Sequence, residues 1–144
     1  MYIPLAYGLT LPDGSEFTGE PDSGDAANGV FHLTGRKQSF TFSNVPGRPV
    51  LSINRGFSAP VIIDTNRSAA DLAFLSAHDD DPFARYEAMQ QLMLDTLVAA
   101  ADRGVRIRLL LDDVNVQGFD PAFLALSQHK MIEIRLFNPT RHHG

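Results

Sequence analysis

Residues 99–113 read AAADRGVRIRLLLDD, and within this stretch the pattern of the chain changes from helix to strand. Before it, apolar residues recur every three to four positions, which predicts an amphipathic helix, and Gly104 is a common type of C-terminal stop. After it, the apolar run ends at Asp112 and Asp113, which is typical of a strand followed by a turn. This stretch therefore separates a helical segment from a strand-containing one.

The residues that follow predict a strand–helix–strand unit. Asp120 and Pro121 suit the N-cap and first position of a helix that ends at about His129. Residues 132–137 form a second apolar run, ended by residues 138–139. Two strands joined by a helix favour a right-handed parallel crossover.

Residues 1–66 predict β structure. Short apolar runs separated by turn residues, at roughly 8–12-residue spacing, favour a sandwich or partial barrel. In one run Phe40 and Phe42 share a face, with Thr41 opposite. The Gly-rich residues 19–29 predict a mobile loop. The predicted strands lie at residues 2–7, 30–34, 39–42, 49–54 and 60–64.

Residues 67–104 predict two helices. Ser68 followed by Asp71 resembles a capping box. Asp81 suits the N-cap and Pro82 the first position of a longer helix, of about 22 residues. Its apolar stripe is expected to face the core and comprises Tyr86, Met89, Met93 and Leu97.

Composition excludes several classes. The chain has 144 residues, 44% hydrophobic and 20% charged, which is ordinary globular usage rather than that of a disordered chain, a collagen or a coiled coil. No apolar run is long enough to span a membrane, and we expect no signal peptide. Without cysteine, disulfides, thiolate metal sites and cysteine nucleophiles are excluded. A net charge of -5 argues against nucleic acid as the main partner.

The charge is unevenly divided. Residues 1–100 hold 12 acidic and 6 basic side chains, whereas residues 101–144 hold 5 acidic and 6 basic ones. The length allows one domain or two small ones, and this difference indicates two compositions within one chain.

Common catalytic motifs are missing: the sequence has no HExxH, GxxxxGK[ST], GxGxxG or GxSxG. Residues 56–60 fail the nucleophile-elbow pattern because Pro60 stands where a second glycine is needed, so Ser58 is expected to be structural. His78 with residues 79–81 offers acidic ligands for a divalent cation. Adjacent side chains point apart, however, and a solvated linker whose last aspartate caps a helix is the favoured interpretation.

Three other groups have both a functional and a structural interpretation. Asp112 and Asp113, with Asn115 nearby, follow a strand at the edge where open α/β sheets bind ligands, or they form a simple strand-end turn. His142–His143 offers metal ligands or a terminal tail, and His129–Lys130 suits a helix C-terminus. The third group meets phosphate or faces solvent and comprises Arg106, Arg108 and Arg135. We assign no residue a catalytic, cofactor-binding or metal-binding role.

Several segments resemble bacterial aminopeptidase N, a gluzincin zinc metallopeptidase: YIPLAYGL at 2–9, SFTFSNV at 39–45 and, most tellingly, RGFSAPV at 55–61. Residues 72–88 look like the entry into that enzyme's helical C-terminal domain. The resemblance covers residues 2–100 and implies the non-catalytic Ig-like β-sandwich and the first helices after it. That family's catalytic motifs, HExxH, a distant zinc-binding Glu and GxMEN, belong to an upstream domain and do not occur here.

Residues 100–113 and 132–139 are similar to the first strands of phospholipase D-like proteins of the cardiolipin-synthase type. That family attacks phosphodiesters through the His of an HxKxxxxD motif, which is absent, and His129–Lys130 does not fit it. This resemblance covers residues 99–139 and meets the first one within a predicted helix, near Ala100. The two together suggest a chimera or fused fragment.

The sequence thus predicts an α+β fold with a β-sandwich domain at 1–66, a helical connector at 67–104 and a βαβ unit with parallel strands at 105–144. We expect no independent catalysis and no cofactor. The alternatives are a partial phospholipase D-like phosphodiesterase or phosphatidyltransferase, an accessory domain of a zinc aminopeptidase, and a protein–protein interaction module. A homo-oligomer through uncovered sheet surface and a cytoplasmic location are also expected.

Overall fold

The computed structural model describes residues 1–112 and 126–137. It divides into two compact units, residues 1–92 and 93–144, which we describe one at a time. The predicted crossover helix lies largely outside the described part of the chain, although residues 126–127 are helical.

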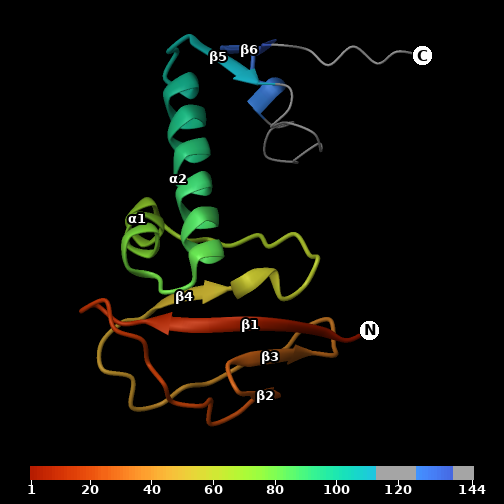
Figure 1. The fold of residues 1–144 in the computed structure, drawn as a ribbon, viewed down its shortest axis with the longest axis vertical. Coiled ribbons are helices and arrows are strands. Elements are labelled where there is room, and N and C mark those ends of the chain that lie inside the picture. The colour runs from red at the N-terminus through yellow and green to blue at the C-terminus, as the bar shows by residue number, and fades with distance from the viewer. Residues whose placement is uncertain (113–125, 138–144) are drawn as a thin grey trace. The chain divides into compact units, whose positions relative to one another are not determined.

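The first unit contains a four-stranded antiparallel sheet in the order β2-β3-β1-β4 (Figure 1). The long strand β1 (Ile3–Thr10) lies between its two neighbours and is shared between them. Its first half pairs with β3 (Val30–Leu33), with Leu5 opposite Phe31. Its second half pairs with β4 (Val50–Ile53), with Tyr7 opposite Ile53. The short strand β2 (Ala26–Ala27) pairs with β3 on its other side.

Stacked aromatic rings form the core beneath this sheet. The rings of Tyr7 and Phe31 are parallel with centroids 3.8 Å apart, and Phe40 stacks on Phe31 at 4.1 Å. Phe42 meets Tyr7 edge-on at 5.7 Å. The prediction that Phe40 and Phe42 share a face is confirmed, because both pack against the same buried cluster.

Two predicted strands are wrong. Residues 39–42 form only an isolated bridge between Ser23 and Thr41, so the aromatic side chains reach the core without a ladder. Residues 60–64 are irregular, because the Val61 N–H bonds back to the Ala59 carbonyl and is removed from any strand pairing. The segment expected to be a mobile loop, residues 19–29, contains β2 and contributes to the sheet.

Both predicted helices are confirmed with their caps. The Ser68 side chain accepts a hydrogen bond from the Asp71 N–H at the start of α1 (Ala69–His78). Asp81 accepts one from the Ala84 N–H, and Pro82 is the first residue of α2 (Pro82–Asp102). Within the first unit, α2 packs on α1 through the following buried residues: Leu72, Leu75 and Ala88.

The predicted core stripe of α2 is largely wrong. Tyr86, Met89 and Met93 are 53%, 51% and 50% exposed. In the first unit the buried side of α2 carries Ala84 and Ala88 instead, because small side chains allow α1 to approach closely. Periodicity located an apolar side of the helix, but not the side that is buried.

The helix ends as predicted at Gly104, whose φ is 89°. The Gly104 N–H bonds to the Ala101 carbonyl and the Val105 N–H to the Ala100 carbonyl. This pair of bonds is the Schellman arrangement, and it favours glycine because the left-handed backbone crowds a Cβ atom.

The second unit contains the predicted parallel pair. β5 (Ile107–Asp112) pairs with β6 (Ile132–Phe137), with Leu109 opposite Ile134. One face of the pair packs with the last turns of α2, so docking onto the long helix covers much of the apolar face. This cluster comprises Leu94, Leu97, Val98, Ala101, Ile107, Leu109, Leu126, Met131, Ile132 and Ile134.

The α+β class is therefore confirmed: an antiparallel sheet, two helices and a parallel strand pair follow in chain order. None of the helices described is long and apolar enough to cross a membrane.

Candidate functional site

The densest group of charged side chains lies in the first unit, around Arg55. Its guanidinium bonds Glu16 at 2.7 Å and both Asp79 and Asp80 at 3.1 Å. The Arg55 Nε also donates to the Ser52 hydroxyl at 2.9 Å. Arg55 and these three carboxylates are called the Arg55 cluster below.

Local backbone geometry brings Arg55 into this position. It begins a short 3₁₀ helix (Arg55–Phe57) that follows β4, and it extends across Gly8 of β1. A Cβ atom at Gly8 would overlap the guanidinium, so the absence of a side chain there makes the room that Arg55 occupies. The Asn54 side chain fixes the turn by bonding the Ala59 N–H and carbonyl at 2.9 and 3.1 Å.

The acidic partners come from the turn between α1 and α2. Asp79 is fully buried, and its Oδ1 accepts from both Arg55 and the Asp81 N–H. Asp80 is largely exposed, and Asp81 caps α2 while its Oδ2 also accepts from the Gly56 N–H at 3.1 Å. The cluster therefore joins the helix turn to the sheet.

Burial and pairing act in opposite directions on these charges. Burial raises the pKa of Glu16 above its usual value, against the lowering effect of its bond to Arg55. Burial alone would lower the pKa of Arg55, but the bond to Glu16 and the charge of Asp79 raise it overall. Arg55 is therefore always charged, and it compensates the buried carboxylate of Asp79.

This geometry accounts for the predicted cation ligands His78, Asp79, Asp80 and Asp81. Two of the carboxylates bond Arg55 and the third caps a helix, while His78 packs on Phe74 with ring centroids 4.7 Å apart. Among residues 1–112 and 126–137, no group of three His, Asp or Glu is placed to hold a metal ion. The linker is not fully solvated, as the favoured interpretation had it, because Asp79 is buried.

Ser58 lies in the same turn. Its hydroxyl accepts from the Ala6 N–H at 2.8 Å and donates to the Asn54 Oδ1 at 3.1 Å. These bonds tie the turn to β1.

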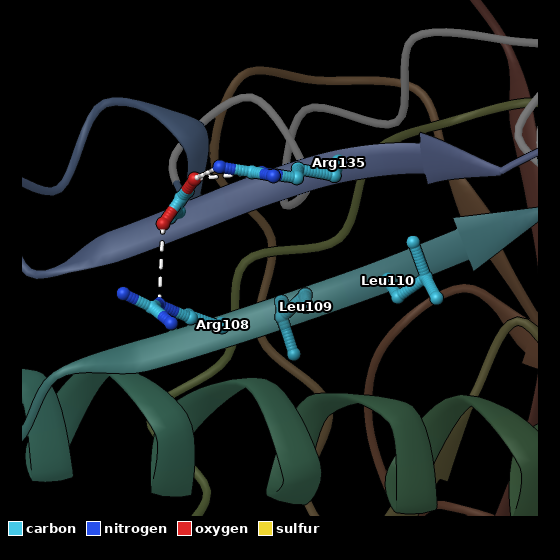
Figure 2. A pocket seen from close by; sticks show the side chains of 5 residues that line it. Arg108, Leu109, Leu110 and Arg135 are labelled. Atoms are coloured by element: carbon cyan, nitrogen blue, oxygen red, sulfur yellow. Dashed lines mark hydrogen bonds and ion pairs between the residues drawn. The ribbon is translucent and has the colours of Figure 1, made fainter.

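A second polar group lies on the outer face of the parallel strands. Figure 2 shows Arg108 and Arg135 on neighbouring strands, reaching the same carboxylate, which belongs to Glu133. The distances are 3.3 Å from Arg108 and 2.7 Å from Arg135. With Leu109 and Leu110, these side chains line a shallow hollow of about 200 Å³.

The outer-face group is exposed and is held together by electrostatics. The bond from Arg135 lowers the pKa of Glu133, with smaller contributions from the charges of Arg108 and Arg106. The three arginines predicted to lie together do share this region, and Glu133 is the counter-ion that the sequence analysis missed. Exposed pairs of this kind bind anions only weakly because solvent screens them.

His129 serves the backbone, as its position at a helix end suggested. Its Nε2 lies 3.0 Å from Asp102 Oδ1, and its Nδ1 accepts from the Met131 N–H at 3.1 Å. The remaining predicted positions lie outside the described residues, apart from Asp112, which ends β5. Those outside are Asp113, Asn115, His142 and His143.

Sequence reasoning missed Arg55 as a charged centre. Its partners Glu16 and Asp79 are 39 and 24 residues away in the chain, so no spacing motif could link them. The available signals were an arginine before a glycine and, separately, an acidic run between two helices.

Two family models match the chain. Residues 1–66 match DUF3458, a domain of unknown function with an Ig-like fold, and residues 69–132 match DUF3458_C, described as ARM repeats. The first range covers the antiparallel sheet. The second covers α1 and α2 but also β5, which is a strand.

The curated relatives are of two kinds. The chain is 33% identical over 93 residues to aminopeptidase N of Escherichia coli (strain K12), which covers 65% of this chain and 11% of that protein. It is 55% identical over 49 residues to cardiolipin synthase C of the same organism, which covers 34% of this chain and 10% of that protein. The chain thus spans about a tenth of the length of these relatives.

A solved structure agrees with the first kind. The crystal structure of Legionella pneumophila aminopeptidase A in complex with aspartic acid matches 86% of this chain and 12% of its own, with a TM-score of 0.57 and 26% identity. Residues 1–66 therefore belong to the DUF3458 Ig-like family and residues 69–132 to DUF3458_C, and the chain resembles aminopeptidase N over about two thirds of its length and a cardiolipin-synthase-type protein over about one third.

Proposed function

We propose that this chain has no catalytic activity of its own and consists of structural segments of two parent proteins, an aminopeptidase N and a phospholipase D-like protein, joined near Ala100. The observation that carries this proposal is the Arg55 cluster. Its acidic side chains most resemble a catalytic or metal site in composition, yet they bond Arg55 and the backbone of the neighbouring helix.

Two further observations support the join. Matches of 93 and 49 residues, to differently named proteins, are short enough to lie end to end within 144 residues. The helix-to-strand change at Gly104 lies beside the proposed join, and an Ala-rich helix end tolerates fusion because alanine has high helix propensity and small packing demands.

An activity assay tests the absence of catalysis. Purified protein is incubated with aminoacyl arylamides and with phosphodiesters, with and without added zinc. We expect no turnover above buffer in any arm. Turnover that survives repurification and is lost in a point variant of this chain would overturn the proposal.

The flanking coding sequence tests the join. A reading frame that continues into an HxKxxxxD motif supports the alternative of a partial phospholipase D-like phosphodiesterase. A frame preceded by HExxH and GxMEN supports an accessory domain of a zinc aminopeptidase. A frame that encodes neither motif on either side supports the chimera.

An interaction module is the second candidate, and the parallel strand pair favours it. In the described part of the second unit, β5 and β6 pair only with each other, which leaves open strand edges beside exposed apolar side chains. The exposed side chains are Leu110, Leu136 and Phe137. Open edges favour pairing with another chain, so we include a homo-oligomer through this sheet surface among the alternatives.

Nucleic acid is not among the proposed partners, given the net charge of -5. The cytoplasm is the location that we propose, and cell fractionation with an antibody to this chain tests it.

A further inference from the structure

One side of α2 carries large apolar side chains that are half exposed. Tyr86, Met89 and Met93 follow one another at three- and four-residue steps, so they line one side of the helix, and we call them the α2 stripe. In the same turns, Ala84 and Ala88 are buried. The smaller residues are therefore inside and the larger ones outside, which is the reverse of what burial of apolar area favours.

Aromatic residues continue the stripe at the N-terminal end of α2. Phe57 is 55% exposed, and its ring meets that of Phe83 edge-on at 5.6 Å. The φ of Phe57 is 55°, a left-handed conformation that a bulky residue rarely adopts. The bond from the Gly56 N–H to Asp81 helps to hold this turn against α2. A strained backbone that keeps an aromatic ring at the surface indicates a use for that ring.

The family match explains why the stripe is uncovered. In helical-repeat proteins each helix pair packs against its neighbours, and an end repeat needs a polar outer face to remain soluble. Residues 69–132 match ARM repeats, yet the chain leaves α2 at Gly104 and continues as the strand β5 rather than as a third helix. Within the described residues, α2 therefore has the apolar side of a repeat without the helix that would pack on it.

We propose that the α2 stripe binds a second copy of this chain, with the two α2 helices antiparallel and the two-fold axis near Met89 and Gln90. The interface is self-complementary, as a two-fold dimer requires. Tyr86 of each copy then lies opposite Met93 of the other. Contacts between methionine sulfur and aromatic rings are favourable.

Charge favours the antiparallel orientation. Arg85 flanks the stripe and is exposed. In the antiparallel pair the two Arg85 residues are separated along the axis by nine residues, or about 13 Å, at the helical rise of 1.5 Å per residue. In a parallel pair they would lie side by side and repel. The proposed register therefore keeps them beyond a Debye length in physiological salt.

The available area predicts a weak dimer. Half-exposed side chains of this size each offer about 100 Å², so the stripe and Phe57 supply about 400 Å² per copy. The total of about 800 Å² is at the lower limit of specific interfaces, which indicates reversible association at high micromolar concentration.

Sedimentation equilibrium of the full chain over a hundredfold concentration range tests the dimer. We expect the mass to rise from monomer to dimer, and Met89→Glu to weaken association at least about tenfold. Gln91→Glu is the matched control, because it adds the same charge to an exposed position on the far side of α2 and is expected to leave association unchanged. A monomer throughout the range overturns the proposal, as does a dimer that Met89→Glu leaves intact.

Leu110→Glu separates this surface from the sheet surface of the interaction-module alternative. Loss of the dimer in Leu110→Glu but not in Met89→Glu assigns association to the strands and overturns the α2 dimer. Circular dichroism of each variant verifies that the fold is retained.

Cross-linking tests the register. The chain has no cysteine, so Met89→Cys and Arg85→Cys each introduce a single thiol. Disulfides need Cα atoms within about 7 Å. We expect mild oxidation to cross-link Met89→Cys but not Arg85→Cys, whereas equal cross-linking of both variants would indicate parallel or non-specific pairing and overturn the register.

Discussion

The guanidinium of Arg55 donates a hydrogen bond of 3.1 Å to the buried carboxylate of Asp79, which lies 24 residues further along the chain. This bond connects the turn after β4 to the turn between α1 and α2. It also gives Asp79 the positive charge that its burial requires, so the Ig-like sheet and the first helices depend on the same pair.

Removing Arg55 is expected to destabilise the first unit strongly. In Arg55→Ala the carboxylate of Asp79 stays buried without a counter-ion, which typically costs about 3–5 kcal/mol in free energy of unfolding. Urea denaturation followed by circular dichroism measures this. Arg108→Ala is the control, because its ion pair with Glu133 is exposed and is expected to contribute less than about 1 kcal/mol. Equal losses in the two variants would contradict a special role for Arg55.

Gly8→Ala is expected to disrupt the same cluster from below. The new Cβ overlaps the guanidinium of Arg55, which is held by four side chains and cannot move without breaking bonds. Overpacking of this kind costs about 1–3 kcal/mol. Gly35→Ala is the matched control, since a Cβ there meets its nearest atom at 3.7 Å.

A double-mutant cycle identifies the cause. In an Arg55→Ala background the obstacle is gone, so Gly8→Ala is expected to cost clearly less than it does alone. If the two losses add, the effect of the methyl group does not act through Arg55.

Acid is expected to weaken the link between Arg48 and Asp71. The paired bonds from Arg48, at 2.9 Å each, lower the pKa of Asp71. A lowered carboxylate pKa contributes stability that is complete above the unfolded value and is lost as pH falls through the folded one. The loss therefore begins near the ordinary value of 3.8 and continues below it.

The variant Arg48→Gln tests this effect. We expect it to be less stable than the unsubstituted chain at neutral pH and to lose less stability on acidification, so that the two denaturation curves converge in acid. A constant difference at every pH would show that Arg48 acts through packing rather than through the charge of Asp71.

The N-cap of α1 provides a local test of helix stability. Ser68→Ala removes the acceptor for the Asp71 N–H and is expected to cost about 1 kcal/mol. Ser76→Ala is the control in the same helix, because the Ser76 hydroxyl donates to the Ala73 carbonyl and caps no free N–H. Thermal unfolding measures both variants, and an equal effect at the two serines would argue against the cap.

Local patterns predicted the features that depend on neighbouring residues. The caps at Ser68 and Asp81, the stop at Gly104 and the strands β1, β3 and β4 all follow from short-range sequence signals. The parallel register of β5 and β6 also follows, because strand–helix–strand order restricts the topology.

Features that depend on distant partners were not predictable. The Arg55 cluster joins three chain segments, and the missing strands at 39–42 and 60–64 have strand-like composition but no partner with a free edge in register. The α2 stripe was misjudged because α2 has apolar residues on two sides, and only the close approach of α1 selects Ala84 and Ala88 for the buried one.

The division of β1 between two partners governs how the first unit assembles. β1 is the first segment to leave the ribosome, yet β3 begins at Val30 and β4 ends only at Ile53. Neither partner pairs with the other, so the sheet cannot close until both have found the same waiting strand. Loop-closure entropy must be overcome twice before any ladder is complete, so this small sheet folds late and in one step, with its N-terminal strand exposed throughout the delay.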